Sequence, residues 1–158
     1  MAYCTQYPSP LGLLTLTVEG NCLTGLWMPT QEIPPAEYIQ NDDLPVFEDV
    51  RRWLDGYFLG NPPDIATLPL SPTGTEFQRK VWEILKTIPY GETTTYGAIA
   101  KSLSPTMSAQ AVGGAVGKNP IAIIIPCHRV VGAKGQLTGY AGGIENKRWL
   151  LRHEEESK

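Results

Sequence analysis

The run Ile121-Ala122-Ile123-Ile124-Ile125-Pro126-Cys127-His128-Arg129-Val130 organises the second half of this sequence. Its five apolar residues predict a short buried strand, and proline ends the strand because it has no N–H to donate to a ladder. Cys127 follows with an imidazole beside it, and a nearby base can convert a thiol into the nucleophilic thiolate. The alternative is an inert buried cysteine, the commoner state of a thiol among apolar residues. Neighbours in an extended strand also point to opposite faces, so His128 need not touch Cys127.

The length and composition exclude several classes of protein. The chain has 158 residues, 42% of them hydrophobic, which is enough for one sizeable core or two small ones. It has no signal peptide and no long apolar span, so we expect a cytoplasmic protein that does not contact membranes. Its three cysteines include no CxxC pair, which disfavours a disulfide scaffold. Its two histidines are too few and badly placed for a zinc site, so we expect no metal.

The charge is distributed unevenly along the chain. The net charge is −3 overall, but residues 1–72 hold two arginines against nine acids, a net charge of −7. Residues 73–158 hold eleven Lys and Arg against seven acids, a net charge of +4. A polyanionic partner would therefore meet the second half, although a charge of +4 is also compatible with an ordinary solvated surface.

Two domains are expected, residues 1–72 and residues 73–158. Residues 3–28 alternate between apolar and polar side chains around turn residues, which predicts a meander of short strands. Apolar residues at helical spacing predict a helix over residues 43–59. Four prolines in residues 60–73 mark the linker.

The second half begins with helices. We predict one helix capped by Thr75, a short helix over residues 95–103, another over residues 108–117, and a final helix over residues 145–155. The two short helices joined by a tight turn suggest a helix-turn-helix. The pair Gly113-Gly114 in the second of them would cost about 1 kcal/mol per glycine in an exposed helix. Such small residues permit the close approach of either a neighbouring helix or a nucleic-acid backbone.

The second half contains an ordered set of motifs. They are Phe77-Gln78-Arg79-Lys80-Val81-Trp82, Gly91-Glu92-Thr93-Thr94-Thr95-Tyr96, Ala111-Val112-Gly113-Gly114-Ala115, Asn119-Pro120, Ile125-Pro126-Cys127-His128-Arg129-Val130-Val131, Gly139-Tyr140 and Lys147 to Glu154. Together these motifs resemble the O6-alkylguanine-DNA alkyltransferase family. The similarity covers residues 75–155 in order without large gaps and is weak in the first half, where it rests mainly on Ser9-Pro10-Leu11-Gly12.

The resemblance implies an α+β protein with a ribonuclease-H-like antiparallel sheet and helix in the N-terminal domain. The C-terminal domain would be helical, with a winged-helix-like helix-turn-helix that enters the minor groove of double-stranded DNA containing O6-alkylguanine. The damaged base would be flipped out of the stack, because the alkyl carbon cannot be reached inside a duplex. We expect a monomer, and the sequence leaves cooperative binding along DNA open.

The resemblance also assigns catalytic roles. Cys127 would accept the alkyl group in an SN2-like displacement, and His128 would take its proton through a bound water. Glu154 would hold and polarise the histidine, which is the nucleophile–base–orienter arrangement of other triads. Tyr96 would help to neutralise the leaving guanine. Asn119 would tie the recognition helix to the active-site strand, and no cofactor is needed.

The base pocket and the DNA-facing surface follow from the same resemblance. The backbone N–H of Ala141 would donate to O6 of the guanine, and Val130 with the carbonyl of Cys127 would read its exocyclic amine. The other expected pocket residues are Tyr140, Gly142 and Ala122, the last of which replaces a proline found in some relatives. The expected DNA-binding residues are Gln110, Thr95, Ala109, Gly113, Gly114, Lys118 and Arg129.

One position departs from the family pattern. Relatives usually carry an arginine where this chain has Gln110, and glutamine is shorter, uncharged and without the planar guanidinium fork. We hypothesise that it supports base flipping less well, so that DNA binding is impaired. Two rival functions are a lesion-binding protein without transfer, and a cysteine hydrolase that would need an oxyanion hole and repeated turnover.

Overall fold

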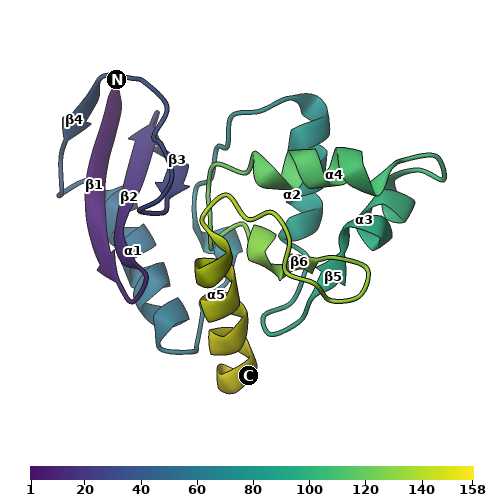
Figure 1. Cartoon of the computed structure of the whole chain (residues 1–158). Helices are drawn as coiled ribbons and strands as arrows, with labels where there is room; N and C mark the ends of the chain where they lie inside the picture. Colours follow the sequence, from purple (N-terminus) through teal and green to yellow (C-terminus); the bar gives the residue numbers. More distant parts are fainter. The chain divides into compact units, whose positions relative to one another are not determined.

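The computed structural model describes residues 1–158, which divide into two compact units. The first unit contains residues 1–73 together with residues 120–124, and the second contains residues 74–119 and 125–158 (Figure 1). None of the helices has both the length and the apolar character that crossing a membrane requires.

The first unit is built on a four-stranded sheet in the order β3-β2-β1-β4. Strands β1 (Ala2–Ser9), β2 (Gly12–Glu19) and β3 (Cys22–Trp27) form the expected antiparallel meander. The short β4 (Tyr38–Gln40) pairs with β1 in parallel, so the sheet is mixed where we expected it to be antiparallel. A proline-rich segment offers few alternating apolar positions, which is why β4 was not predicted.

Helix α1 (Pro45–Phe58) packs against β2 and β3 through an apolar face that ends at Trp53 and Tyr57 (Figure 1). The helical spacing of its buried residues confirms the predicted helix, with proline in the first turn, where its missing N–H costs nothing. A single 3-10 turn, η1 (Ile65–Thr67), interrupts the predicted linker and is capped by the side chain of Asp64.

The apolar run that precedes Cys127 is not a strand, and that prediction was wrong. Only Ile121 pairs with a neighbour, in an isolated parallel bridge to Leu26. The chain then folds back: the N–H of Ile124 donates to the carbonyl of Ala122 at 2.8 Å, and Ile123 adopts a φ of 69°. An apolar run of five residues requires burial, and a buried turn provides it as well as a strand does.

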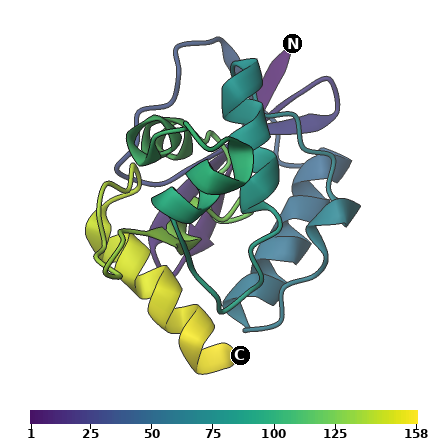
Figure 2. The same cartoon turned by 90° about the vertical axis from the view of Figure 1, so that its right-hand side faces the viewer.

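The second unit is helical at its start, as predicted. Helix α2 (Glu76–Leu85) begins with a capping box in which Thr75 and Gln78 bond each other's backbone N–H groups. Helix α3 (Tyr96–Leu103) is capped by Thr95, and α4 (Ala109–Gly117) is capped by a serine in the same manner. Helix α4 packs against both α2 and α3 (Figure 2), which gives the expected pair of short helices joined by a turn.

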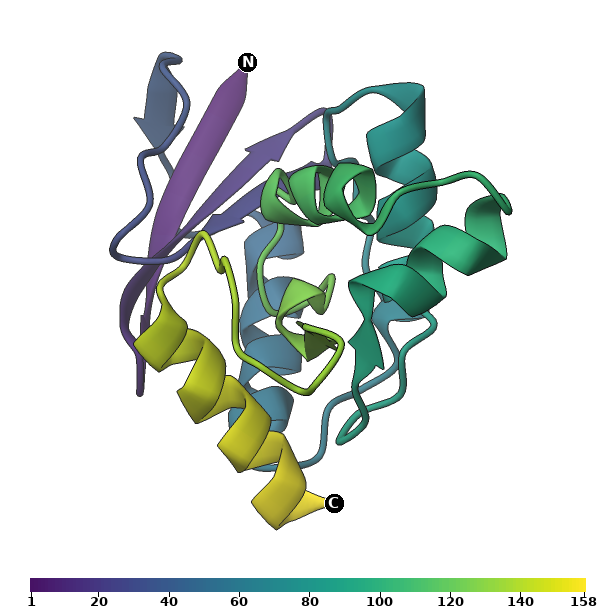
Figure 3. The same cartoon turned by 45° about the vertical axis from the view of Figure 1, so that its right-hand side comes forward.

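A two-strand ladder that the sequence did not predict links this pair to the cysteine. Strand β5 (Thr94–Thr95) runs directly into α3 and pairs in parallel with β6 (Val130–Val131). Strand β6 directly follows η2 (Cys127–Arg129), a 3-10 turn. The loop of residues 132–143 then leads to α5 (Ile144–Ser157), which contacts η2 (Figure 3).

Candidate active site

Cys127 lies at the start of the 3-10 turn η2 and is 7% exposed. Its N–H donates to the carbonyl of Ile125 at 2.8 Å, and Pro126 between them has φ −80° and ψ 65°, the geometry of an inverse γ-turn. Because Cys127 and His128 share a helical turn, the opposite-face geometry expected of a strand does not apply.

The environment of Cys127 raises the pKa of its thiol through burial, and three neighbours oppose that effect. The Asn119 side chain and the positive charge of Lys147 lower this pKa, and so does the nearby hydroxyl of Tyr140, which is buried without a hydrogen-bond partner. Asn119 follows α4 and also donates from Nδ2 to the carbonyl of Ile125 at 2.8 Å. The asparagine therefore connects the second helix of the pair to the turn that holds the cysteine.

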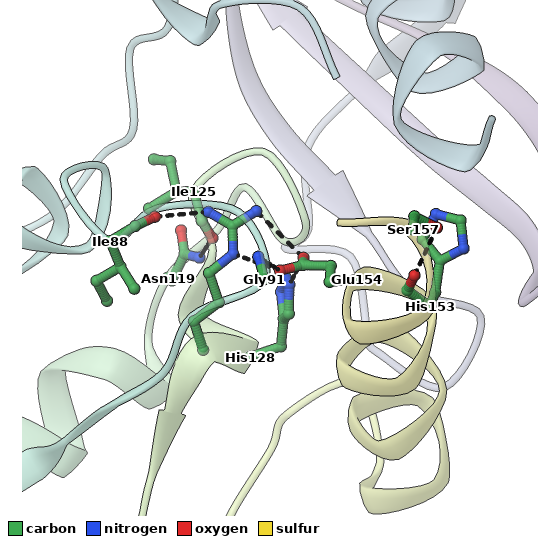
Figure 4. Close-up of polar contacts among 9 residues, drawn as sticks. Ile88, Gly91, Asn119, Ile125, His128, His153, Glu154 and Ser157 are labelled. Carbon is green, nitrogen blue, oxygen red and sulfur yellow. Dashed lines mark hydrogen bonds and ion pairs between the residues drawn. The ribbon is translucent and has the colours of Figure 1, made fainter. Parts of the chain in front are cut away.

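His128 and Glu154 form the central contact of the site. His128 Nε2 lies 2.5 Å from Glu154 Oε2, and the two side chains are 0% and 1% exposed (Figure 4). Burial lowers the pKa of His128, although Glu154 opposes the shift, so the ring is neutral near pH 7. A carboxylate can only accept, so Nε2 donates to Glu154 and Nδ1 is the basic nitrogen of the ring.

Arg129 completes the surroundings of Glu154. Its Nε donates to Oε1 at 2.8 Å and its Nη2 to Oε2 at 3.1 Å, while Nη1 donates to the carbonyl of Ile88 at 2.8 Å. Burial raises the pKa of Glu154, but the hydrogen bonds from His128 and Arg129, together with the positive charge of Arg129, outweigh it and hold that pKa well below its usual range. Arg129 is 8% exposed, which leaves little of its side chain accessible for the DNA contact that was expected of it.

The turn at Gly91 supplies one more donor. Its N–H donates to Glu154 Oε1 at 3.0 Å, and its φ of 80° lies in the left-handed region that favours glycine. Glu154 on α5 thus accepts from side chains of η2 and from the backbone before α3. These contacts fix the carboxylate and, through it, the ring of His128.

Tyr96 and Tyr140 lie near the cysteine from two different segments. The ladder of β5 with β6 places Tyr96 at the start of α3, and its hydroxyl donates to the carbonyl of Thr138 at 3.3 Å. Burial raises the pKa of Tyr140 well above its ordinary value, and the charge of Cys127 adds to the shift. The pKa of Tyr96 is raised mainly by burial as well, with a smaller contribution from Cys127.

Lys147 also belongs to this site, and the sequence reasoning did not single it out. It lies on α5, is 0% exposed, and donates from Nζ to the carbonyl of Thr138 at 3.1 Å. The sequence did contain a signal for the burial of Lys147, because its spacing puts it on the same helical face as the buried Leu150 and Glu154. A charged residue on the buried face of a helix is rare enough to mark a functional candidate.

The other residues expected to line the base pocket differ in burial and in position. Val130 is buried in β6, Gly142 is buried with its carbonyl accepting from Asn146 Nδ2 at 2.7 Å, and Ala141 is exposed. Ala122 is buried in the first unit, in the turn described above.

The expected DNA-binding residues concentrate on α4. Those with exposed positions are Ala109, Gln110, Gly114 and Lys118. A Cβ built on Gly114 would meet no atom within 4 Å, whereas one on Gly113 would lie 3.7 Å from the Tyr96 ring. The two glycines therefore have different surroundings: Gly113 faces α3, and Gly114 leaves the outer surface of α4 open. The hydroxyl of Thr95 is used to cap α3.

A cavity of about 500 Å³ lies elsewhere in the second unit and does not reach Cys127. Helix α5 lines it with Arg148, Leu151 and Arg152, and Val131 and Leu137 also line it. Glu154 borders this cavity and also holds His128, so the cavity adjoins the site without containing the nucleophile.

Comparison with known proteins gives consistent matches over the whole chain. Residues 2–72 match the ribonuclease-like domain of 6-O-methylguanine DNA methyltransferases, and residues 76–156 match their DNA-binding domain. The methylated-DNA–protein-cysteine methyltransferase of Mycobacterium tuberculosis is 48% identical over 98% of this chain and 93% of its own length. The Haemophilus influenzae protein of that name is 44% identical over 97% of this chain and 86% of its own. A crystal structure of the Mycobacterium tuberculosis protein in complex with DNA superposes with a TM-score of 0.91 at 44% identity, covering 98% of this chain and 94% of that one.

Proposed function

Because the chain belongs to the 6-O-methylguanine DNA methyltransferase family, we propose that it repairs O6-alkylguanine in double-stranded DNA by moving the alkyl group to Cys127. Its enzyme class is methylated-DNA–protein-cysteine methyltransferase, the name carried by its curated relatives. One observation supports Cys127 as the acceptor of the alkyl group. His128, the residue that follows it, is held by Glu154, with Nε2 of the histidine 2.5 Å from Oε2 of the glutamate.

The first step is formation of the thiolate. Burial raises the pKa of the Cys127 thiol, so the cysteine needs a base to ionise near neutral pH. His128 is neutral and donates from Nε2 to Glu154, which leaves Nδ1 to take the proton through a bound water. Glu154 is kept ionised by Arg129 and then stabilises the imidazolium that forms.

The second step is displacement at the alkyl carbon. The sulfur of Cys127 forms a bond to that carbon while the bond from carbon to O6 breaks, and the electron pair passes to the guanine. Tyr96 donates to the base and helps to neutralise this negative charge. The N–H of Ala141 donates to O6, and the carbonyls of Cys127 and Val130 accept from the exocyclic amine. Tyr140 lines the base.

Helices α3 and α4 bring the damaged guanine to Cys127. We place α4 in the minor groove, where the exposed backbone at Gly114 allows a DNA strand to approach closely, and the damaged guanine is flipped toward Cys127. Asn119 links the end of α4 to the carbonyl of Ile125, beside the nucleophile. Gln110 enters the duplex where relatives use arginine, and its shorter neutral side chain supports the flipped state less well.

The product is S-alkylcysteine, a thioether that no nearby residue can cleave. Each molecule therefore acts once and needs no cofactor. To test this, the protein is mixed with an excess of duplex containing O6-methylguanine, and the repaired guanine is counted against the protein. One guanine per molecule supports the proposal. Continued turnover would identify a hydrolase, and binding without loss of the methyl group would identify a lesion-binding protein.

A further inference from the structure

Lys147 is a buried cation that forms no ion pair. Its side chain is 0% exposed, and the only hydrogen bond of its ammonium goes to the carbonyl of Thr138 at 3.1 Å. An ammonium carries three donors, so one carbonyl leaves most of its capacity unused. The carboxylate of the site, on Glu154, is occupied by His128, Arg129 and Gly91 instead.

The groups around Lys147 belong to the reaction described above. Nζ lies 5.9 Å from the ring centroid of Tyr96 and 6.0 Å from that of Tyr140, distances at which aromatic faces attract a cation. Its charge favours the thiolate of Cys127 and disfavours protonation of His128. The titratable groups facing it are thus these two tyrosines, the cysteine and the histidine, on α3, the loop of residues 132–143 and η2.

Such an arrangement is unfavourable for stability alone. A buried charge without a partner of opposite sign is costly, and even a buried ion pair can often be replaced by apolar residues of similar volume without loss of stability. Transfer of the alkyl group, however, brings a negative charge to this position. It resides first on the sulfur of Cys127 and then on the guanine that leaves, and no carboxylate or other resident anion competes with it for Lys147.

We propose that Lys147 supplies the counter-charge for alkyl transfer, which makes it a further functional residue of this site. The inference rests on the proposed function. Burial lowers the pKa of Lys147 and the negative charge of Cys127 opposes that shift, so the thiolate itself favours the ammonium form. The ammonium gives up no proton in the reaction: the proton of Cys127 passes to His128, the sulfur–carbon bond forms, and the carbon–O6 bond breaks. The electron pair goes to the guanine, whose ring nitrogen takes a proton from water while the imidazolium of His128 returns its proton to water, so that the protons balance. Lys147 lowers the energy of both anionic species without exchanging atoms with them.

Substitution by methionine and arginine separates charge from shape. K147M keeps most of the length of the side chain and removes the charge, and K147R keeps the charge. K80M changes an exposed lysine of α2 as the matched control. The first readout is carbamidomethylation of Cys127 by iodoacetamide across pH 6–10 (a range spanning the ordinary cysteine pKa), followed by peptide mass spectrometry. Cys4 and Cys22 serve as internal references because both are free and partly exposed.

The second readout is the single-turnover rate of methyl transfer over the same pH range. For K147M we expect the midpoint of both titrations to rise by about one pH unit, so that the rates below it fall about tenfold. K147R and K80M should keep the midpoint of the unmodified protein. We also expect the melting temperature of K147M to equal or exceed that of the unmodified protein, which separates a loss of charge from a loss of folding.

Three results would overturn the proposal. The first is an unchanged midpoint in K147M, and the second is a K147R protein that behaves like K147M. The third is a rate loss that occurs only when the protein unfolds, which would mean that Lys147 only holds the backbone at Thr138. If the unmodified protein transfers no methyl group, the proposed function fails instead. The iodoacetamide titration would still report whether Lys147 favours the thiolate.

Discussion

His128 Nε2 and Glu154 Oε2 lie 2.5 Å apart, and neither side chain is accessible to solvent beyond 1%. The contact joins η2 to α5 across 26 residues of sequence. It fixes the tautomer of the imidazole and therefore decides which nitrogen can act as a base. Through this pair, α5 sets the orientation of the imidazole that follows the thiol in sequence.

Replacing Glu154 with glutamine should slow alkyl transfer. Glutamine keeps the approximate shape but removes the negative charge that stabilises the imidazolium, so we expect the single-turnover rate at pH 7 to fall about 10²-fold, the lower end of the range for acid–base assistance. The matched control is E155Q, which neutralises the exposed neighbouring carboxylate on the same helix. Equal rates in E154Q and the unmodified protein would remove Glu154 from the mechanism.

Glu154 should also make the fold sensitive to acid. Its folded-state pKa is depressed, so its stabilising contribution is complete above its unfolded-state pKa of about 4.3 and is lost as the pH falls towards the folded value. Urea unfolding between pH 3 and pH 7 should show a steeper loss of unfolding free energy in the unmodified protein than in E154Q. Parallel curves would mean that the pKa of Glu154 is not depressed in the folded state.

Arg129 should matter for stability rather than for DNA affinity. Removing it by R129M leaves the buried carboxylate of Glu154 undercompensated, and breaking a buried ion pair costs about 3–5 kcal/mol. The exposed pair of Arg148 with Glu145 provides the control, since R148M should cost only about 0.2–1 kcal/mol. Urea unfolding gives both values. A strong salt-dependent loss of DNA binding in folded R129M at low temperature would instead place Arg129 on the DNA surface.

Replacing Gln110 with arginine should strengthen engagement of the duplex. Gln110 is exposed on the first turn of α4, so the longer guanidinium can be accommodated without repacking. We expect Q110R to bind duplex containing O6-methylguanine more tightly and to transfer faster, by about tenfold, the effect of one well-placed additional contact. Q110K adds charge without the planar fork and should gain less. No change in either binding or rate would refute the impairment hypothesis.

Local sequence signals predicted the helices of the second unit well. Thr75, Thr95 and Ser108 each cap the helix that they were expected to begin, because a side-chain oxygen bonding a free N–H is a strictly local interaction. The run of residues 121–125 was mispredicted because burial alone does not distinguish a strand from a buried turn. The ladder of β5 with β6 joins residues 36 positions apart, and its two residue pairs leave no readable periodicity.

The site was predictable to different degrees. The resemblance pointed to Glu154 as the partner of His128, although as the first of three successive glutamates it carries no distinctive local pattern. The burial of Arg129 was not predicted because its partners, Glu154 and Ile88, are 25 and 41 positions away. The burial of Lys147 depends on the loop of residues 132–143, whose path no local pattern determines.

The most direct test of the account is the mass of the protein after reaction with duplex DNA that contains O6-methylguanine. We predict that the intact protein gains the mass of one methyl group, that peptide mapping places it on Cys127, and that C127S gains nothing under the same conditions. A methyl group on Cys4 or Cys22, or loss of the lesion with no gain in protein mass, would contradict the assignment of Cys127 as the acceptor.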